Sequence, residues 1–141
     1  MKEVSSKSDK LTGIRVCLID NDKETLSLVN TVLSRQSYSC LSISNTIGSS
    51  SKINQFQPHV LIIDPKTLAI DGKTLIDIYK QTLHQMPVVI IFSAIDLHEL
   101  EQIARNTHID DFVHKDDGVL RLLGRINLYV QQIKMSKELS C

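Results

Sequence analysis

The chain has 141 residues, of which 42% are hydrophobic and 23% are charged, and its 16 basic and 16 acidic residues give a formal net charge of zero. One domain with a substantial core is expected at this length, and the even charge balance argues against a broad nucleic-acid-binding face. No apolar stretch is long enough to span a membrane, and the polar N-terminus does not resemble a signal peptide, so a cytoplasmic protein is expected.

Apolar runs alternate with helical patterns along the first half of the chain. Ile14–Ile19 is apolar and is interrupted only by Arg15, which favours a strand buried on both faces. Asp22 is suited to cap a helix from about Lys23 to Arg35. The predicted elements that follow are a more polar strand at Tyr38–Ile43, a short helix at Ser49–Phe56 and a strand at His59–Ile63.

The second half continues the alternation. A loop from Pro65 to Gly72 is predicted after Asp64, and the apolar run Val88–Phe92 predicts a strand that ends at Ser93-Ala94. A helix is predicted from about Lys73 to Leu83, and a second helix, capped by Asp96, ends near Asn106 with Leu97 and Leu100 inward. A strand at Asp111–His114 follows. The last predicted element is a helix from Gly118 to about Ile133, whose inward residues are Leu120, Leu123, Ile126 and Val130.

Five strands and five helices in strict alternation predict right-handed crossovers and a parallel sheet with helices on both faces. The expected class is therefore α/β, with a flavodoxin-like (βα)5 fold and strand order 2-1-3-4-5. The predicted domain covers residues 13–134. Residues 1–12 are expected to form a flexible tail, and residues 135–141 a C-terminal tail or linker stub.

Charged side chains follow three of the predicted strands. Because parallel strands end at one edge of a sheet, we expect Asp20, Asp64 and Lys115 to lie together. Phosphoryl transfer needs a nucleophile, a divalent cation and a fixed positive charge. Asp64 can form an acyl phosphate, Asp20 and Asp64 can hold Mg²⁺, and Lys115 can pair with the phosphoryl group, to which Ser93 can donate a hydrogen bond.

The order of these residues resembles the response-regulator receiver domain, the phosphoacceptor module of two-component signalling. The resemblance covers about Ile14 to Val130 and rests on matching residues after successive strands, namely Asp20-Asn21, Asp64, Asp71-Gly72, Ser93-Ala94, Phe112 and Lys115. It implies that Asp64 is the phosphoacceptor and that Ser93 and Phe112 form the switch. It also implies a Mg²⁺ site made by Asp20, Asn21, Asp64 and the backbone carbonyl of Lys66.

The same resemblance implies the partners and the chemistry. A sensor histidine kinase or a phosphotransfer protein would donate the phosphoryl group, and homodimers would form through the face of the fourth helix, fifth strand and fifth helix. The domain would be a signalling module whose only catalysis is its own phosphotransfer and dephosphorylation. Neither direct nucleic-acid binding nor membrane binding is expected of this chain.

Three positions depart from the family pattern. Asn21 replaces the second acid, which removes one negative charge from the metal site, and the neighbouring Asp22 could supply that charge if the turn bends toward the site. Thr67-Leu68 replaces the usual Met-Pro, so this loop is expected to have a different shape. Asp116 stands where a proline commonly follows the lysine, which removes a rigid element.

Alternative functions remain open at this point. Taken singly, Asp64-Pro65 could start an ordinary turn and Lys115 could be a solvated lysine. Asn21 and the altered loop would also suit a pseudo-receiver, which keeps the fold and acts as a protein-interaction module without phosphorylation. A flavodoxin-like enzyme or nucleotide binder is a third alternative, but the acidic loop at Asp20–Lys23 is not the glycine-rich loop that binds phosphate.

Overall fold

The computed structural model describes residues 13–67 and 71–140 and contains a five-stranded parallel sheet in the order β2-β1-β3-β4-β5. The flavodoxin-like α/β fold and the strand order expected from the sequence are thereby confirmed. The proposed N-terminal tail at residues 1–12 and Leu68 of the altered loop lie outside the described residues. The strands are β1 (Arg15–Ile19), β2 (Ser39–Ile43), β3 (Val60–Ile63), β4 (Val88–Ser93) and β5 (Asp111–His114).

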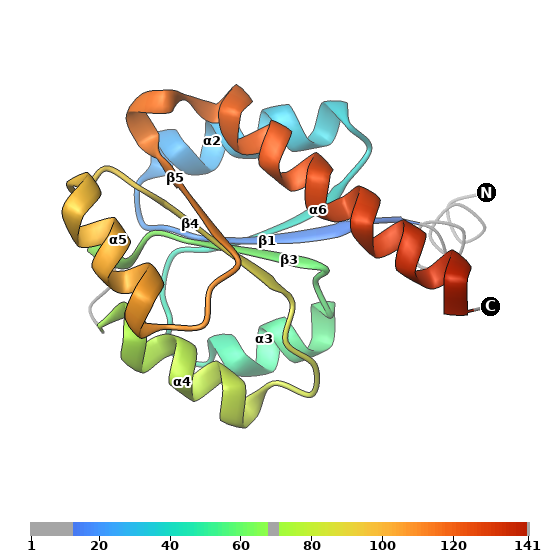
Figure 1. Ribbon diagram of the computed structural model, residues 1–141, viewed down its shortest axis with the longest axis horizontal. Helices are drawn as coiled ribbons and strands as arrows, with labels where there is room; N and C mark the ends of the chain where they lie inside the picture. Colours follow the sequence, from blue (N-terminus) through green and yellow to red (C-terminus); the bar gives the residue numbers. More distant parts are fainter. Residues whose placement is uncertain (1–12, 68–70, 141) are drawn as a thin grey trace.

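Helices cover both faces of the sheet, as Figure 1 shows. One face packs against α2 and α6, and the other packs against α3, α4 and α5. All side chains of β3, and all but the first of β1 and of β4, are buried because they alternate between these two cores. The helices are α2 (Lys23–Arg35), α3 (Ser49–Phe56), α4 (Gly72–Thr82), α5 (Leu97–Asn106) and α6 (Val119–Ser140), with short 3-10 turns η1 (Pro65–Thr67) and η2 (Lys115–Asp117).

The register of the central strands places their carboxyl ends side by side. Ile19 of β1 pairs with Ile63 of β3, so the residues after them, Asp20 and Asp64, are neighbours. The backbone N–H of Asp64 donates to the carbonyl of Ile19 at 3.1 Å, which extends the parallel pairing by one residue. The sheet therefore brings the two aspartates together through backbone hydrogen bonds alone.

The C-terminal helix differs from the expectation in length and in its buried stripe. It continues through Ser140, beyond the predicted end near Ile133. Leu120 is 73% exposed, whereas Leu122 is buried together with Ile126 and Val130. These three residues repeat every four positions and form one helical face, which fits the core better than the face that begins with Leu120. The expected inward stripe was therefore wrong at Leu120.

Helix α5 also buries less than its pattern predicted. Leu100 is buried, but Leu97 is 56% exposed at the first residue of the helix, directly after the cap Asp96. By contrast, α4 buries the large side chains of Ile76 and Tyr79 completely. In the described part of the chain, none of the helices combines the length and the apolar character that crossing a bilayer requires.

Candidate functional site

Two buried carboxylates share one ammonium at the carboxyl edge of the sheet. The Lys115 Nζ lies 2.9 Å from Oδ2 of Asp20 and 2.8 Å from Oδ2 of Asp64. Both aspartates are buried, whereas the lysine side chain keeps 17% of its surface exposed. The structure thus assembles residues from the ends of β1, β3 and β5, as the sequence predicted.

Backbone amides orient the same two carboxylates. The N–H of Asp22 donates to Oδ1 of Asp20 at 2.9 Å, and the N–H of Lys66 donates to Oδ1 of Asp64 at 3.0 Å. Each carboxylate therefore has one oxygen on a backbone donor and the other on Lys115. Charge-assisted hydrogen bonds of this kind fix the orientation of each carboxylate.

The environment of Lys115 also favours its charged form. Burial alone would lower its pKa, but hydrogen bonds from the ammonium to Asp64 and Asp20, together with their negative charges, hold the pKa above its ordinary value. The turn η2 places the lysine directly after β5, and the N–H of Gly118 donates to the Lys115 carbonyl at 3.0 Å. The missing proline at Asp116 therefore does not prevent the lysine from reaching the acidic edge.

Asp22 does not replace the missing acid at Asn21. Its carboxylate caps α2, accepting from the N–H of Glu24 at 3.3 Å and from the hydroxyl of Thr25 at 2.7 Å. The hydrogen bond from Thr25 is the main cause that lowers the pKa of Asp22, and the charge of Lys115 contributes less. Asn21 itself is exposed. The capping role expected for Asp22 is confirmed.

Ser93 lies on β4, which is next to β3, and Phe112 lies on β5, the edge strand beyond β4. Ser93, the last residue of β4, is buried, and its Oγ accepts from the N–H of Ile95 at 3.3 Å. Ala94 is exposed next to it, so a small side chain borders the approach to this edge. Phe112 is partly buried and packs on the core between the sheet and helices α3 to α5.

The Asp71-Gly72 pair has a packing role at the start of α4. Asp71 caps the helix, since its carboxylate accepts from the N–H of Thr74 at 3.3 Å. A Cβ added to Gly72 would lie 2.8 Å from Cβ of Pro65, which real side chains do not tolerate. Glycine is thus required because the first turn of α4 approaches the residue that follows Asp64.

The oxygen donors at this edge suit Mg²⁺. Magnesium binds through one or two carboxylates and retains several waters, and the site offers the carboxylates of Asp20 and Asp64 with the carbonyl of Lys66 nearby in sequence. Within residues 13–67 and 71–140, no group of three or more histidine, cysteine or acidic residues could hold a metal. The site therefore offers one carboxylate fewer to a metal ion than a site with three acidic residues would.

Comparisons with known proteins agree with this fold. A family model described as the response regulator receiver domain matches residues 16–127. No curated protein matches the sequence. Among solved structures, the signal receiver domain of a response regulator from Bermanella marisrubri is 23% identical, with a TM-score of 0.75 over 84% of this chain and 99% of that one.

Two further structures show the same fold. The receiver domain of the Francisella response regulator 1452 is 24% identical, with a TM-score of 0.74 over 86% of this chain and 99% of that one. A CheY-like response regulator receiver domain protein from Methanospirillum hungatei JF-1 is 18% identical, with a TM-score of 0.75 over 88% and 99% of the two chains.

Proposed function

The chain belongs to the response regulator receiver domain family, and from this we propose that it accepts a phosphoryl group on Asp64 from a histidine kinase or a phosphotransfer protein. The observation that carries the proposal is the contact of Lys115 Nζ with Asp64 at 2.8 Å and with Asp20 at 2.9 Å. Phosphoryl transfer depends mainly on positioning and on charge stabilisation, and these three side chains provide both.

In the proposed reaction, a carboxylate oxygen of Asp64 attacks the phosphorus of a phosphohistidine, the P–N bond breaks and an acyl phosphate forms. Bound Mg²⁺, held by Asp20, Asp64 and the carbonyl of Lys66, would offset the negative charge of the phosphoryl oxygens. Lys115 exchanges part of its contact with Asp64 for a contact with the phosphoryl group. The hydroxyl of Ser93 donates a hydrogen bond to a phosphoryl oxygen.

The consequence that we propose is a change in the face formed by α5, β5 and α6. Ser93 ends β4 directly beside β5, where it pairs with His114, so a movement of Ser93 toward a phosphoryl group would be felt at β5. Phe112 lies on the same strand and is only partly buried, which leaves it room to change rotamer. This face is also the proposed homodimer contact.

The proposal is tested by incubating the protein with Mg²⁺ and acetyl phosphate and measuring its intact mass. One added phosphoryl group that is lost with hydroxylamine and absent from Asp64→Asn is the expected result. Omitting Mg²⁺ should abolish the adduct, because two carboxylates and the phosphoryl oxygens would then face Lys115 alone. A phosphorylated Asp64→Asn variant, or no adduct at all, would contradict the proposal.

A second function, the phosphorylation-independent pseudo-receiver, is favoured by one observation. Asp22 is committed to capping α2 and Asn21 is neutral, so among the residues that the structure describes only Asp20 and Asp64 supply carboxylates at the metal site. If Mg²⁺ binding is too weak for phosphorylation, the surface of the domain would act without a switch. Beryllofluoride separates the two functions, since a pseudo-receiver gives neither a phosphoryl adduct nor beryllofluoride-dependent chemical-shift changes.

A further inference from the structure

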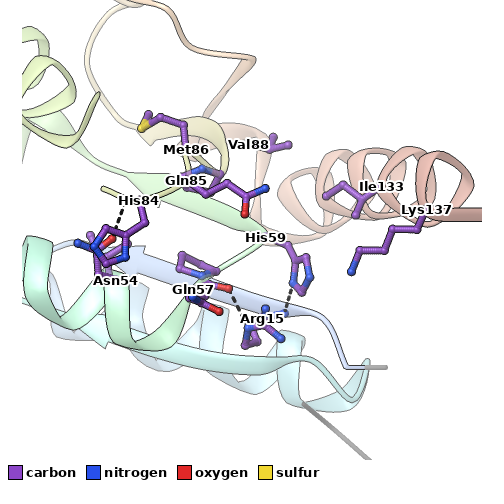
Figure 2. Close-up of a pocket in the computed structure, with 13 residues that line it drawn as sticks. Arg15, Asn54, Gln57, His59, His84, Gln85, Met86, Val88, Ile133 and Lys137 are labelled. Carbon is purple, nitrogen blue, oxygen red and sulfur yellow. Dashed lines mark hydrogen bonds between the residues drawn. The ribbon is translucent and has the colours of Figure 1, made fainter. Parts of the chain in front are cut away.

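A cavity lies at the edge of the sheet opposite to Asp64, where the strands begin. It has a volume of about 370 Å³ and is lined in part by Arg15 at the start of β1, His59 before β3, Val88 at the start of β4 and Lys137 of α6 (Figure 2). Small-molecule sites occupy roughly 300–1,000 Å³, so this volume is sufficient for a small ligand. We call it the basic cavity.

The basic cavity is positively charged although the chain as a whole is neutral. Arg15 and Lys137 line it together with His59 and His84, and no Asp or Glu is present among the described residues of the lining. Because the formal net charge of the chain is zero, the positive charge reflects local sorting rather than a basic composition. A concave cationic surface with protein walls concentrates anions.

Hydrogen bonds hold the side chains of this cavity in place. Nε of Arg15 donates to the carbonyl of Gln57 at 2.8 Å, and the backbone N–H of Arg15 donates to Nδ1 of His59 at 3.0 Å. The His59 proton is therefore on Nε2, which is a donor. Gln57 has a φ of 51°, a conformation that costs energy for a residue other than glycine and that is found disproportionately at functional sites.

The charges of Arg15 and Lys137 act on the same point of the cavity, the ring of His59. Burial is the main cause that lowers the pKa of His59 to about 4, and the charges of Arg15 and Lys137 also contribute. Figure 2 shows the Lys137 side chain extending from α6 toward His59, with Arg15 on the other side of the ring. Arg15 forms no ion pair within the described chain, and its guanidinium can bind a carboxylate or phosphate with two parallel hydrogen bonds.

We propose that the basic cavity binds a small organic anion, whose carboxylate or phosphate group pairs with Arg15 and Lys137. The apolar part of the ligand would contact Met86, Val88 and Ile133, which also line the cavity. The compact volume favours a small molecule over a peptide chain. Ligand binding would not block phosphorylation of Asp64, because His59 and Asp64 lie at opposite ends of β3.

Nuclear magnetic resonance with the ¹⁵N-labelled full chain tests this proposal. Phenyl phosphate and phenylacetate serve as anionic probes and benzyl alcohol as the neutral probe, all at one ionic strength. Saturable shifts of the amides of Arg15, His59 and Val88 with an anion, and binding of benzyl alcohol at least about tenfold weaker, would support the proposal. Binding of phenyl phosphate alone would identify phosphate esters, and binding of phenylacetate alone would identify carboxylates.

Charge variants on one helix provide the matched control. Lys137→Gln should weaken anion binding about tenfold, because it removes one charge-assisted contact. Lys134→Gln removes an equal charge from an exposed position one turn earlier in α6 and should leave binding unchanged. Equal binding of the neutral probe, equal effects of both variants, or no saturable shift at millimolar probe would overturn the proposal.

Discussion

Replacing Lys115 with methionine tests the electrostatic balance of the acidic edge. In the wild type, one ammonium stands within 2.9 Å of two buried carboxylates, Asp20 and Asp64. Methionine keeps much of the apolar stem but removes the charge, so the variant would bury both carboxylates without their shared cation. We therefore expect the free energy of unfolding to fall in the absence of divalent cations.

The size of this loss follows from the geometry. A contact at 2.8 Å corresponds to roughly 6 kcal/mol of Coulomb attraction at an effective dielectric constant of about 20. Desolvation offsets most of that attraction, and removal of one partner from a buried ion pair typically costs about 3–5 kcal/mol. Because the Lys115 side chain is 17% exposed, we expect a loss at the lower end of this range, about 3 kcal/mol at pH 7.

Urea unfolding followed by far-ultraviolet circular dichroism measures the effect, since the chain has no tryptophan. The control is Lys66→Met, an exposed lysine beside the site whose backbone bond to Asp64 survives the change, and its effect should stay within about 0.5 kcal/mol. Adding Asp64→Asn to Lys115→Met should restore part of the loss by removing one like charge. A loss below about 1 kcal/mol for Lys115→Met would refute the reasoning, because exposed ion pairs contribute that little.

Three further predictions concern packing, pH and metal. Gly72→Ala should lower the free energy of unfolding by about 1–3 kcal/mol, since its Cβ would lie 2.8 Å from Pro65. A Cβ at Gly124 on α6 meets nothing within 4 Å, so Gly124→Ala should stabilise the protein by up to about 1 kcal/mol. Urea unfolding measures both effects. Burial lowers the pKa of His59 from 6.5 to about 4 in the folded chain, so between these pH values the unfolded chain binds more protons than the folded chain. The free energy of unfolding should therefore fall by about 1–2 kcal/mol as the pH drops from 6.5 to 4. Urea unfolding of His59→Asn over the same pH range should show a smaller fall. Asn21→Asp adds a negative charge near the metal site, which should contribute roughly 1 kcal/mol to binding and raise Mg²⁺ affinity about fivefold or more. Calorimetry measures this affinity, and an unchanged value would exclude position 21 as a ligand.

The sequence was sufficient to predict the sheet and the meeting of its charged residues. Apolar runs fix which segments form buried strands, and in a parallel sheet the residues that follow those runs must share one edge. Asp20, Asp64 and Lys115 could therefore be placed together without knowledge of a single side-chain torsion. Their distances and shared hydrogen bonds needed the structure.

Other features depended on choices that the pattern leaves open. Leu120, Leu122 and Leu123 stand close together, so two helical stripes are equally apolar and only packing against the sheet selects Leu122. The direction of Asp22 depends on the turn after β1, where capping competes with metal binding. The basic cavity is lined by Arg15 near the beginning of the sequence and by Lys137 near its end, and no local pattern predicts that these two residues line one cavity.

The most direct test of the central claim is to locate the phosphoryl group within the chain. Borohydride reduces an aspartyl phosphate to homoserine, and tandem mass spectrometry of peptides from the treated protein identifies the converted residue. Homoserine at Asp64 alone, dependent on both Mg²⁺ and phosphodonor, is the predicted result. Homoserine at Asp20 or Asp71, or conversion at no aspartate while the folded protein binds Mg²⁺, would contradict the assignment of Asp64 as the phosphoacceptor.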